Sequence, residues 1–113
     1  MTKQEFILFI NILGFQQTWL EKPNLFSFKT DVENNYLNID IDDNSELFQL
    51  KKTKMWSFMQ SGENFGNFSL KTFGNSGDFQ LEIFLSFILG SFKKPPHHIV
   101  EYMRDRKIEN ILN

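Results

Sequence analysis

The sequence predicts a single α+β domain over residues 1–113, in which an antiparallel β-meander of about four strands packs against one N-terminal helix and two C-terminal helices. Three observations predict this class. Residues 25–73 alternate apolar and polar side chains between short turns rich in Asn, Asp, Gly and Ser, as is typical of strands joined in chain order. Apolar runs with helical start or stop signals flank this segment on both sides. A length of 113 residues fits one domain.

The first helix is expected to begin after Thr2 and to end near residues 19–21. Thr2 and Glu5 have the spacing of a capping box, in which two side chains satisfy the first free backbone N–H groups of a helix. The following residues, from Phe6 to Phe15, are apolar on nearly every side, which predicts a helix that is mostly buried. Pro23 cannot continue a helix and sets its latest possible end.

Four strands are expected next, over residues 25–30, 36–42, 46–54 and 65–73, with turns at 43–45 and 61–64. Residues 55–60 either prolong the third strand or follow a bend near Thr53. The second strand has the clearest pattern. Its inward side chains are expected to be Leu37, Ile39 and Ile41, and its solvent-facing ones Asn38, Asp40 and Asp42.

Two helices are expected after the sheet. Residues 79–91 fit a helix capped by Asp78 and closed by Gly90. A strand competes there because every second residue is apolar, but Phe84 and Ile88 interrupt that alternation, which favours the helix. Pro95 and Pro96 suit the first turn of a last helix.

Composition restricts the possible functions. The chain has 14 Phe, no Ala, no Cys and only two Arg, a pattern that A- and T-rich codons produce and that indicates a low-GC bacterium or its phage. Without Cys, disulfides and thiolate chemistry are excluded. A net charge of −2 gives no overall attraction to nucleic acid or anionic membrane. The apolar runs 6–15 and 79–89 are shorter than the roughly 20 residues of a spanning helix, so we expect a cytoplasmic protein.

Two candidate metal sites have simpler explanations. His97, His98 and Glu101 share one face of the last helix, but the chain holds no further His to complete a site, and a polar first helical turn explains them. The acidic segment 40–46 lacks the Gly and the Glu of a calcium loop, since Ser45 and Lys51 occupy those positions. No nucleophile motif is present. We therefore expect no catalytic residue, no metal and no cofactor.

Charged and aromatic residues instead suggest a binding surface. Basic and aromatic residues between 51 and 58 suit single-stranded nucleic acid, although lysines are also ordinary on exposed strands. A second basic cluster lies in the last helix, and the acidic residues concentrate before residue 47, so the surface is expected to be bipolar and suited to a protein partner. The candidate partner-binding residues are Lys51, Lys52, Lys54, Trp56, Tyr102, Arg104, Arg106 and Lys107.

In size, low-GC composition and lack of catalytic motifs, the chain resembles small phage-encoded inhibitors of bacterial defence such as the anti-CRISPR proteins. Those proteins share no common fold or functional residues, so the resemblance implies no site residue. It implies a partner, an RNA-guided nuclease or its guide RNA, that is blocked stoichiometrically. The predicted function is a non-catalytic binding protein of this kind. The alternatives are an RNA or single-stranded nucleic-acid-binding module, and an immunity protein that neutralises a toxin.

Overall fold

The computed structural model describes residues 1–19, 21–54, 62–75, 77 and 79–112, with the backbone alone for 18, 19 and 107–112. Within them, no helix is both long enough and apolar enough to cross a membrane. The elements, in chain order, are α1 (Lys3–Leu13), β1 (Gln16–Trp19), β2 (Lys22–Lys29), β3 (Tyr36–Ile41), β4 (Leu47–Thr53), β5 (Gly62–Ser69), α2 (Gln80–Gly90) and α3 (His97–Leu112).

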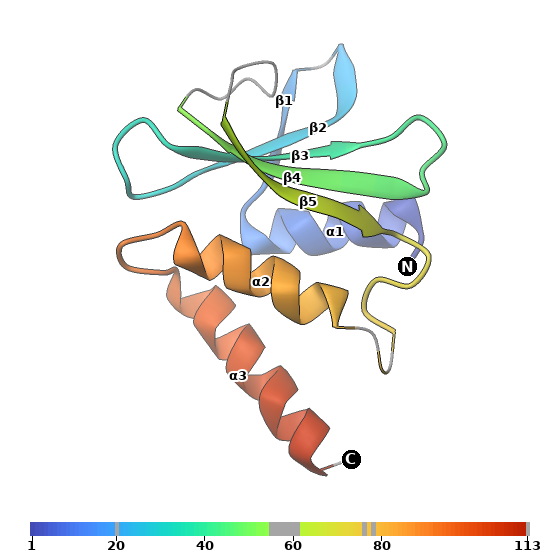
Figure 1. Ribbon diagram of the computed structural model, residues 1–113, viewed down its shortest axis with the longest axis vertical. Helices are drawn as coiled ribbons and strands as arrows, with labels where there is room; N and C mark the ends of the chain where they lie inside the picture. The colour runs from blue at the N-terminus through green and yellow to red at the C-terminus, as the bar shows by residue number, and fades with distance from the viewer. Residues whose placement is uncertain (20, 55–61, 76, 78, 113) are drawn as a thin grey trace.

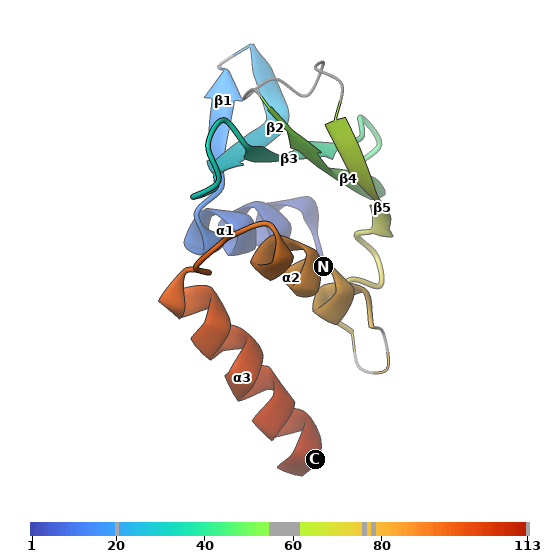
Figure 2. The same cartoon turned by 60° about the vertical axis from the view of Figure 1, so that its left-hand side comes forward.

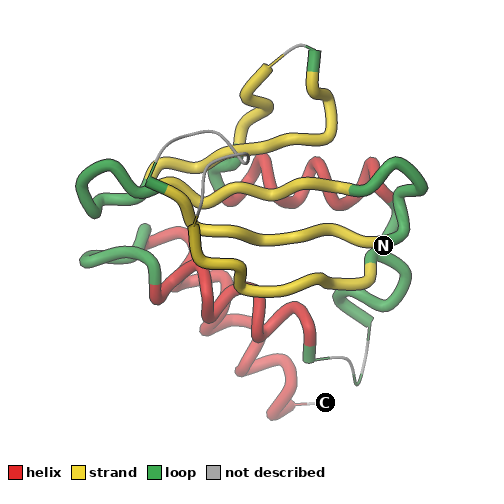
Figure 3. Tube along the Cα trace, turned by 45° about the horizontal axis from the view of Figure 1, so that its top comes forward, coloured by secondary structure: helices red, strands yellow, loops and turns green. Residues whose placement is uncertain are grey.

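The five strands form one antiparallel sheet in chain order, β1-β2-β3-β4-β5. Helices α1 and α2 lie side by side against one face of the sheet, and α3 extends away from them (Figures 1 and 2). Figure 3 shows the helices behind that face and the β1–β2 hairpin rising from one side of the sheet. The predicted α+β meander with three helices is confirmed, and the sheet has five strands instead of about four. The helix predicted at 79–91 is present as α2, but its C-cap is Ser91 and not Gly90, which is the last helical residue.

The extra strand exists because α1 ends earlier than predicted. Gly14 follows the helix with φ of +127°, and its N–H donates to the carbonyl of Ile10 at 3.1 Å. The N–H of Phe15 also donates to the Ile10 carbonyl, at 2.9 Å, which closes the helix with a left-handed turn typical of glycine. The expected end at residues 19–21 is therefore wrong, since Gly14, and not Pro23, stops the helix and releases Gln16–Trp19 to pair with β2.

The last strand is displaced from its predicted range. β5 spans Gly62–Ser69 instead of 65–73, and the expected turn at 61–64 is wrong because residues 62–64 already pair with β4. A β-bulge in β5, where its register with β4 shifts, explains why this segment has the composition of a turn. Gly66 has φ of +135°, and its N–H donates to the Asn64 side chain at 2.9 Å. Residues 55–60 and Asp78, about which the sequence made predictions, lie outside the described residues.

The core is a cluster of phenylalanine rings between the sheet and the two helices. Phe48, near the start of β4, has its ring centroid 4.2 Å from that of Phe6 in α1, 5.1 Å from that of Phe68 in β5 and 5.6 Å from that of Phe84 in α2. All four side chains are buried. Leu37, Ile39 and Ile41 of β3 point into the same cluster, as predicted.

The polar side of β3 differs from its prediction. Asn38 was expected to face water, but it is 0% exposed. Its side-chain oxygen accepts a hydrogen bond from the Ser27 hydroxyl at 2.6 Å, and its amide donates to the Thr53 hydroxyl at 2.8 Å. Buried polar groups are normally paired in this way. The three side chains join β2, β3 and β4 on the sheet face opposite the helices.

Two glycine substitutions test the closure of α1. In Gly14→Ala the new Cβ would lie 2.8 Å from the Phe28 ring at a φ that disfavours side chains. We expect a loss of roughly 1–3 kcal/mol of unfolding free energy, measured by urea denaturation. Gly90→Ala, at the open end of α2, is the matched control and should be neutral or stabilising by up to about 1 kcal/mol. Equal stability of both variants would contradict this account of the α1 end.

Candidate interaction surface on the helices

Large apolar side chains are exposed on the helices. Leu8 and Ile12 of α1 are 65% and 75% exposed, and Phe79, at the start of α2, is 71% exposed. A spacing of four residues places Leu8 and Ile12 on one face of α1. The expectation that α1 is mostly buried is therefore wrong along this face. The sequence carried a sign of it, because the neighbouring positions on that face, Gln4 and Asn11, are polar and also exposed.

The first turns of α3 hold this helix against both α1 and α2. Ile99 is fully buried in the core. The His98 Nε2 atom lies 2.9 Å from the carbonyl oxygen of Leu13, the last residue of α1. The Tyr102 ring lies 5.7 Å from the ring of Phe9 in α1. Beyond these contacts, the helix diverges from the other two toward its C-terminus (Figures 1 and 2).

An ion pair adds a polar contact between α3 and α2. Arg106 Nη2 donates to Glu82 Oε1 at 3.0 Å, and about a quarter of each side chain is exposed. Glu82 Oε2 and Arg106 Nε are buried and have no hydrogen-bond partner within the described part of the chain. The pair is therefore incompletely satisfied, which reduces its contribution to stability.

The predicted basic segment does not form one surface. Lys52 stands opposite the core residue Leu37 in the sheet register, and its Nζ lies 3.4 Å from Glu63 Oε2 and 5.7 Å from the Phe65 ring centroid. Lys51 stands opposite Asn38 and so faces away from the helices. Lys54 is exposed just after β4, and Trp56 lies outside the described residues. Lys51 and Lys52 therefore lie on opposite faces of the sheet, and their contact with a partner stays a prediction.

The predicted cluster in α3 is also divided. Tyr102 is partly exposed beside α1, whereas Arg106 is engaged with Glu82. Arg104 is exposed, with its Nη2 3.7 Å from Glu101 Oε1. The side chain of Lys107 is not among those described. Of the described side chains in this group, Tyr102 and Arg104 are exposed on the surface.

The candidate metal ligands make contacts within the protein. His97 Nε2 lies 2.8 Å from Glu101 Oε1, while the adjacent His98 points to the end of α1. Asp42 Oδ1 accepts the N–H of Glu46 at 2.8 Å and so closes the turn between β3 and β4. In the part of the chain that the structure describes, no three His, Asp or Glu side chains converge as metal ligands.

Comparison with known proteins finds no match to any family model, curated protein or solved structure. Function must therefore be inferred from the side chains themselves.

One carboxylate fixes the connection that leads into α3. Asp31, in the loop after β2, accepts the backbone N–H of Lys93 at 2.6 Å and that of Lys94 at 2.7 Å. Both hydrogen bonds lower the pKa of Asp31, and the one from the Lys94 N–H has the larger effect. The loop between α2 and α3 is thereby tied to the sheet, 62 residues away in the chain.

Asp31→Asn tests this tie. The lowered pKa of Asp31 means that its stabilising effect is complete above the unfolded-state pKa, about 3.9, and is lost as pH falls through the folded-state pKa. We expect wild type to have a larger free energy of unfolding than Asp31→Asn at pH 6, as measured by urea denaturation. This difference should shrink toward pH 2. Glu33→Gln, in the same loop, removes an equal charge from an exposed side chain and is the control. A difference that stays constant with pH would contradict the role of Asp31.

Proposed function

We propose that the protein is a non-catalytic binding protein that docks α1 and the start of α3 against a macromolecular partner. The observation that carries the proposal is the exposure of Leu8 and Ile12 on one face of α1, next to the Phe9–Tyr102 contact with α3. We call Leu8, Ile12 and Tyr102 the α1/α3 surface. Grouped exposed apolar and aromatic side chains are typical of protein interfaces, where a few of them dominate binding.

The use of the chain's imidazoles supports a non-catalytic role. His98 meets the terminal carbonyl of α1, and His97 pairs with Glu101 on the same helix. Among the described residues, neither imidazole is held beside a hydroxyl group in a hydrogen bond of the kind that activates a nucleophile. Binding is therefore the activity that these side chains favour.

For the partner, we propose a component of a bacterial defence system, an RNA-guided nuclease in the first place, blocked stoichiometrically in the cytoplasm. Support comes from the small size, the low-GC composition and the resemblance to anti-CRISPR proteins. The nucleic-acid-binding alternative receives less support, because Lys51 and Lys52 face opposite sides of the sheet. An immunity protein would use the same α1/α3 surface, and a toxin gene beside its own gene would distinguish it.

Tagged protein expressed in a low-GC bacterial host with active defence systems tests both parts of this proposal. Wild type should recover a protein partner near one-to-one, with and without RNase, and should inhibit its activity. Ile12→Glu places a charge at the centre of the α1/α3 surface and should reduce recovery and inhibition by roughly tenfold or more. Asn67→Glu adds the same charge on β5, on the face away from the helices, and should leave both unchanged.

Two results would count against the proposal at different levels. Full recovery of the partner by Ile12→Glu would reject the α1/α3 surface. A panel of RNA-guided nucleases that keep full cleavage activity at saturating protein would reject that partner class. Recovery of bulk nucleic acid alone, lost with RNase, would favour the nucleic-acid-binding module.

A further inference from the structure

A cavity of about 270 Å³ opens between the C-terminal end of α2 and the neighbouring ends of β4 and β5. On the sheet side, β4 contributes Lys52, and β5 contributes Glu63 and Phe65. On the other side, the last turns of α2 and its cap contribute residues 86, 87, 90 and 91. The cavity is separate from the α1/α3 surface, because it lies on other elements.

Helix α2 carries small residues at this cavity. Ser86 and Gly90 are four residues apart, so they lie on the same face of the helix, and both are exposed. A Cβ atom at Gly90 would meet no other atom within 4 Å. The chain therefore leaves space open here, in contrast to the densely packed ring cluster on the opposite face of the same helix.

Two aromatic rings form a wall of the cavity. The rings of Phe65 and Phe87 are stacked, with their centroids 4.8 Å apart and their planes 17° from parallel. Both side chains are half-buried, whereas the rings around Phe48 are buried in the core. A stacked pair that keeps part of its surface open beside a cavity offers a platform for a further planar ring.

One cation stands next to this platform. The Lys52 Nζ atom lies 5.7 Å from the centroid of the Phe65 ring and 3.4 Å from Glu63 Oε2. The Lys52 side chain is 32% exposed and that of Glu63 is 63% exposed, so this ion pair contributes little to stability. An anionic group of a ligand can therefore replace the Glu63 carboxylate at the Lys52 ammonium group.

The hydroxyl groups at the cavity are hydrogen-bond acceptors. Ser86 Oγ donates its proton to the carbonyl oxygen of Glu82 at 2.8 Å, and Ser91 Oγ donates to that of Phe87 at 2.8 Å. Each hydroxyl oxygen still has lone pairs to offer. A ligand that fits these groups has a planar ring, N–H donors on the edge of that ring and an attached anion.

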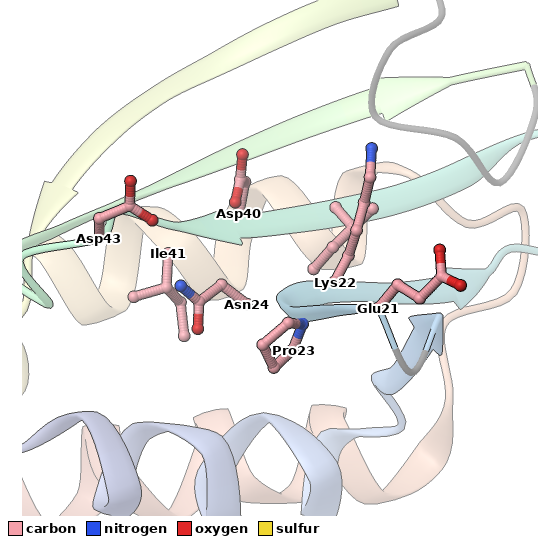
Figure 4. Close-up of a pocket in the computed structure, with 8 residues that line it drawn as sticks. Glu21, Lys22, Pro23, Asn24, Asp40, Ile41 and Asp43 are labelled. Atoms are coloured by element: carbon pink, nitrogen blue, oxygen red, sulfur yellow. The ribbon is translucent and has the colours of Figure 1, made fainter.

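The cavity between β2 and β3 differs in this respect (Figure 4). Its volume is similar, about 260 Å³, and three carboxylates and one ammonium group line it, but no aromatic ring does so among the side chains that the structure describes. Stacking of a planar ligand is therefore favoured at the cavity beside α2.

We infer that the cavity between α2 and the β4–β5 pair binds a nucleotide, with its base stacked on the Phe65–Phe87 pair and its phosphate bound to Lys52. A nucleotide combines the planar ring, the N–H donors and the anion in one molecule. It is supplied either as a free nucleotide or as one unit of a single-stranded nucleic acid. The inference does not rest on the proposed function, and it requires Lys52 without Lys51.

Titrations of the ¹⁵N-labelled full-length protein with adenosine 5′-monophosphate (AMP), followed by two-dimensional NMR, test the inference. AMP should shift the amide signals of residues 52, 63–65 and 86–91. Adenosine, which lacks the phosphate, and ribose 5-phosphate, which lacks the base, should each bind roughly fivefold more weakly or worse. Lys52→Gln should weaken AMP binding by roughly fivefold or more, and Lys51→Gln, the same charge change on the other face of the sheet, by less than about twofold.

Two further variants keep the test independent of folding defects. Glu63→Gln removes the carboxylate that competes for Lys52 and should tighten AMP binding by roughly twofold or more. Gly90→Leu places a side chain in the open space and should block AMP binding, while a Leu stabilises a helix better than a Gly does. Gly90→Ala adds a single carbon atom and should weaken binding less than Gly90→Leu does.

A short oligoadenylate separates the two sources of the nucleotide. Tighter binding of the oligoadenylate than of AMP, at equal nucleotide concentration, would identify a single-stranded nucleic acid, and equal or weaker binding a free nucleotide. The inference would be overturned if millimolar AMP caused no shifts at the cavity, or if adenosine or ribose 5-phosphate bound as tightly as AMP. Unchanged AMP affinity in both Lys52→Gln and Gly90→Leu would overturn it as well.

Discussion

The packing of phenylalanine rings between the sheet and its two covering helices is the interaction on which the other features depend. Phe48 contributes the central ring, and Phe6, Phe68 and Phe84 approach it from α1, β5 and α2. Aromatic pairs contribute roughly 0.5–1.5 kcal/mol each beyond the area they bury. Because the rings on both helices meet the same ring on β4, α1 and α2 are fixed relative to each other, and their outer faces form a defined surface.

The third helix packs against that surface, and the loop that leads into it is tied to the loop after β2 by Asp31. Its anchors are the buried side chain of Ile99, the contact of His98 with the carbonyl oxygen at the end of α1, and the ion pair with α2. These contacts cover only part of α1 and α2, which is why Leu8 and Ile12 stay exposed although the helix that carries them is strongly apolar. Incomplete coverage of an apolar helix by its own chain leaves area for another molecule.

Local patterns in the sequence predicted the elements better than they predicted exposure. The period of two in β3 and the capping box of α1 depend on neighbouring residues alone, and both agree with the structure. The early end of α1 was missed although Gly14 carries a common stop signal, a Gly directly after the last helical residue. The burial of Asn38 and the exposure of Ile12 arise from contacts between distant segments, which periodicity does not report. In contrast, strand alternation alone places Lys51 and Lys52 on opposite faces, so the division of that basic segment was predictable from the sequence.

Side-chain footprinting with a carbene label, on the purified protein alone and in complex with a captured partner, tests the central claim most directly. The account predicts that labelling of Leu8, Ile12 and Tyr102 falls in the complex, while labelling of the sheet residues Gln49, which is half-buried, and Asn67, which is exposed, changes little. Protection confined to the sheet, with Leu8 and Ile12 labelled as in the free protein, would contradict the assignment of the α1/α3 surface as the partner-binding site.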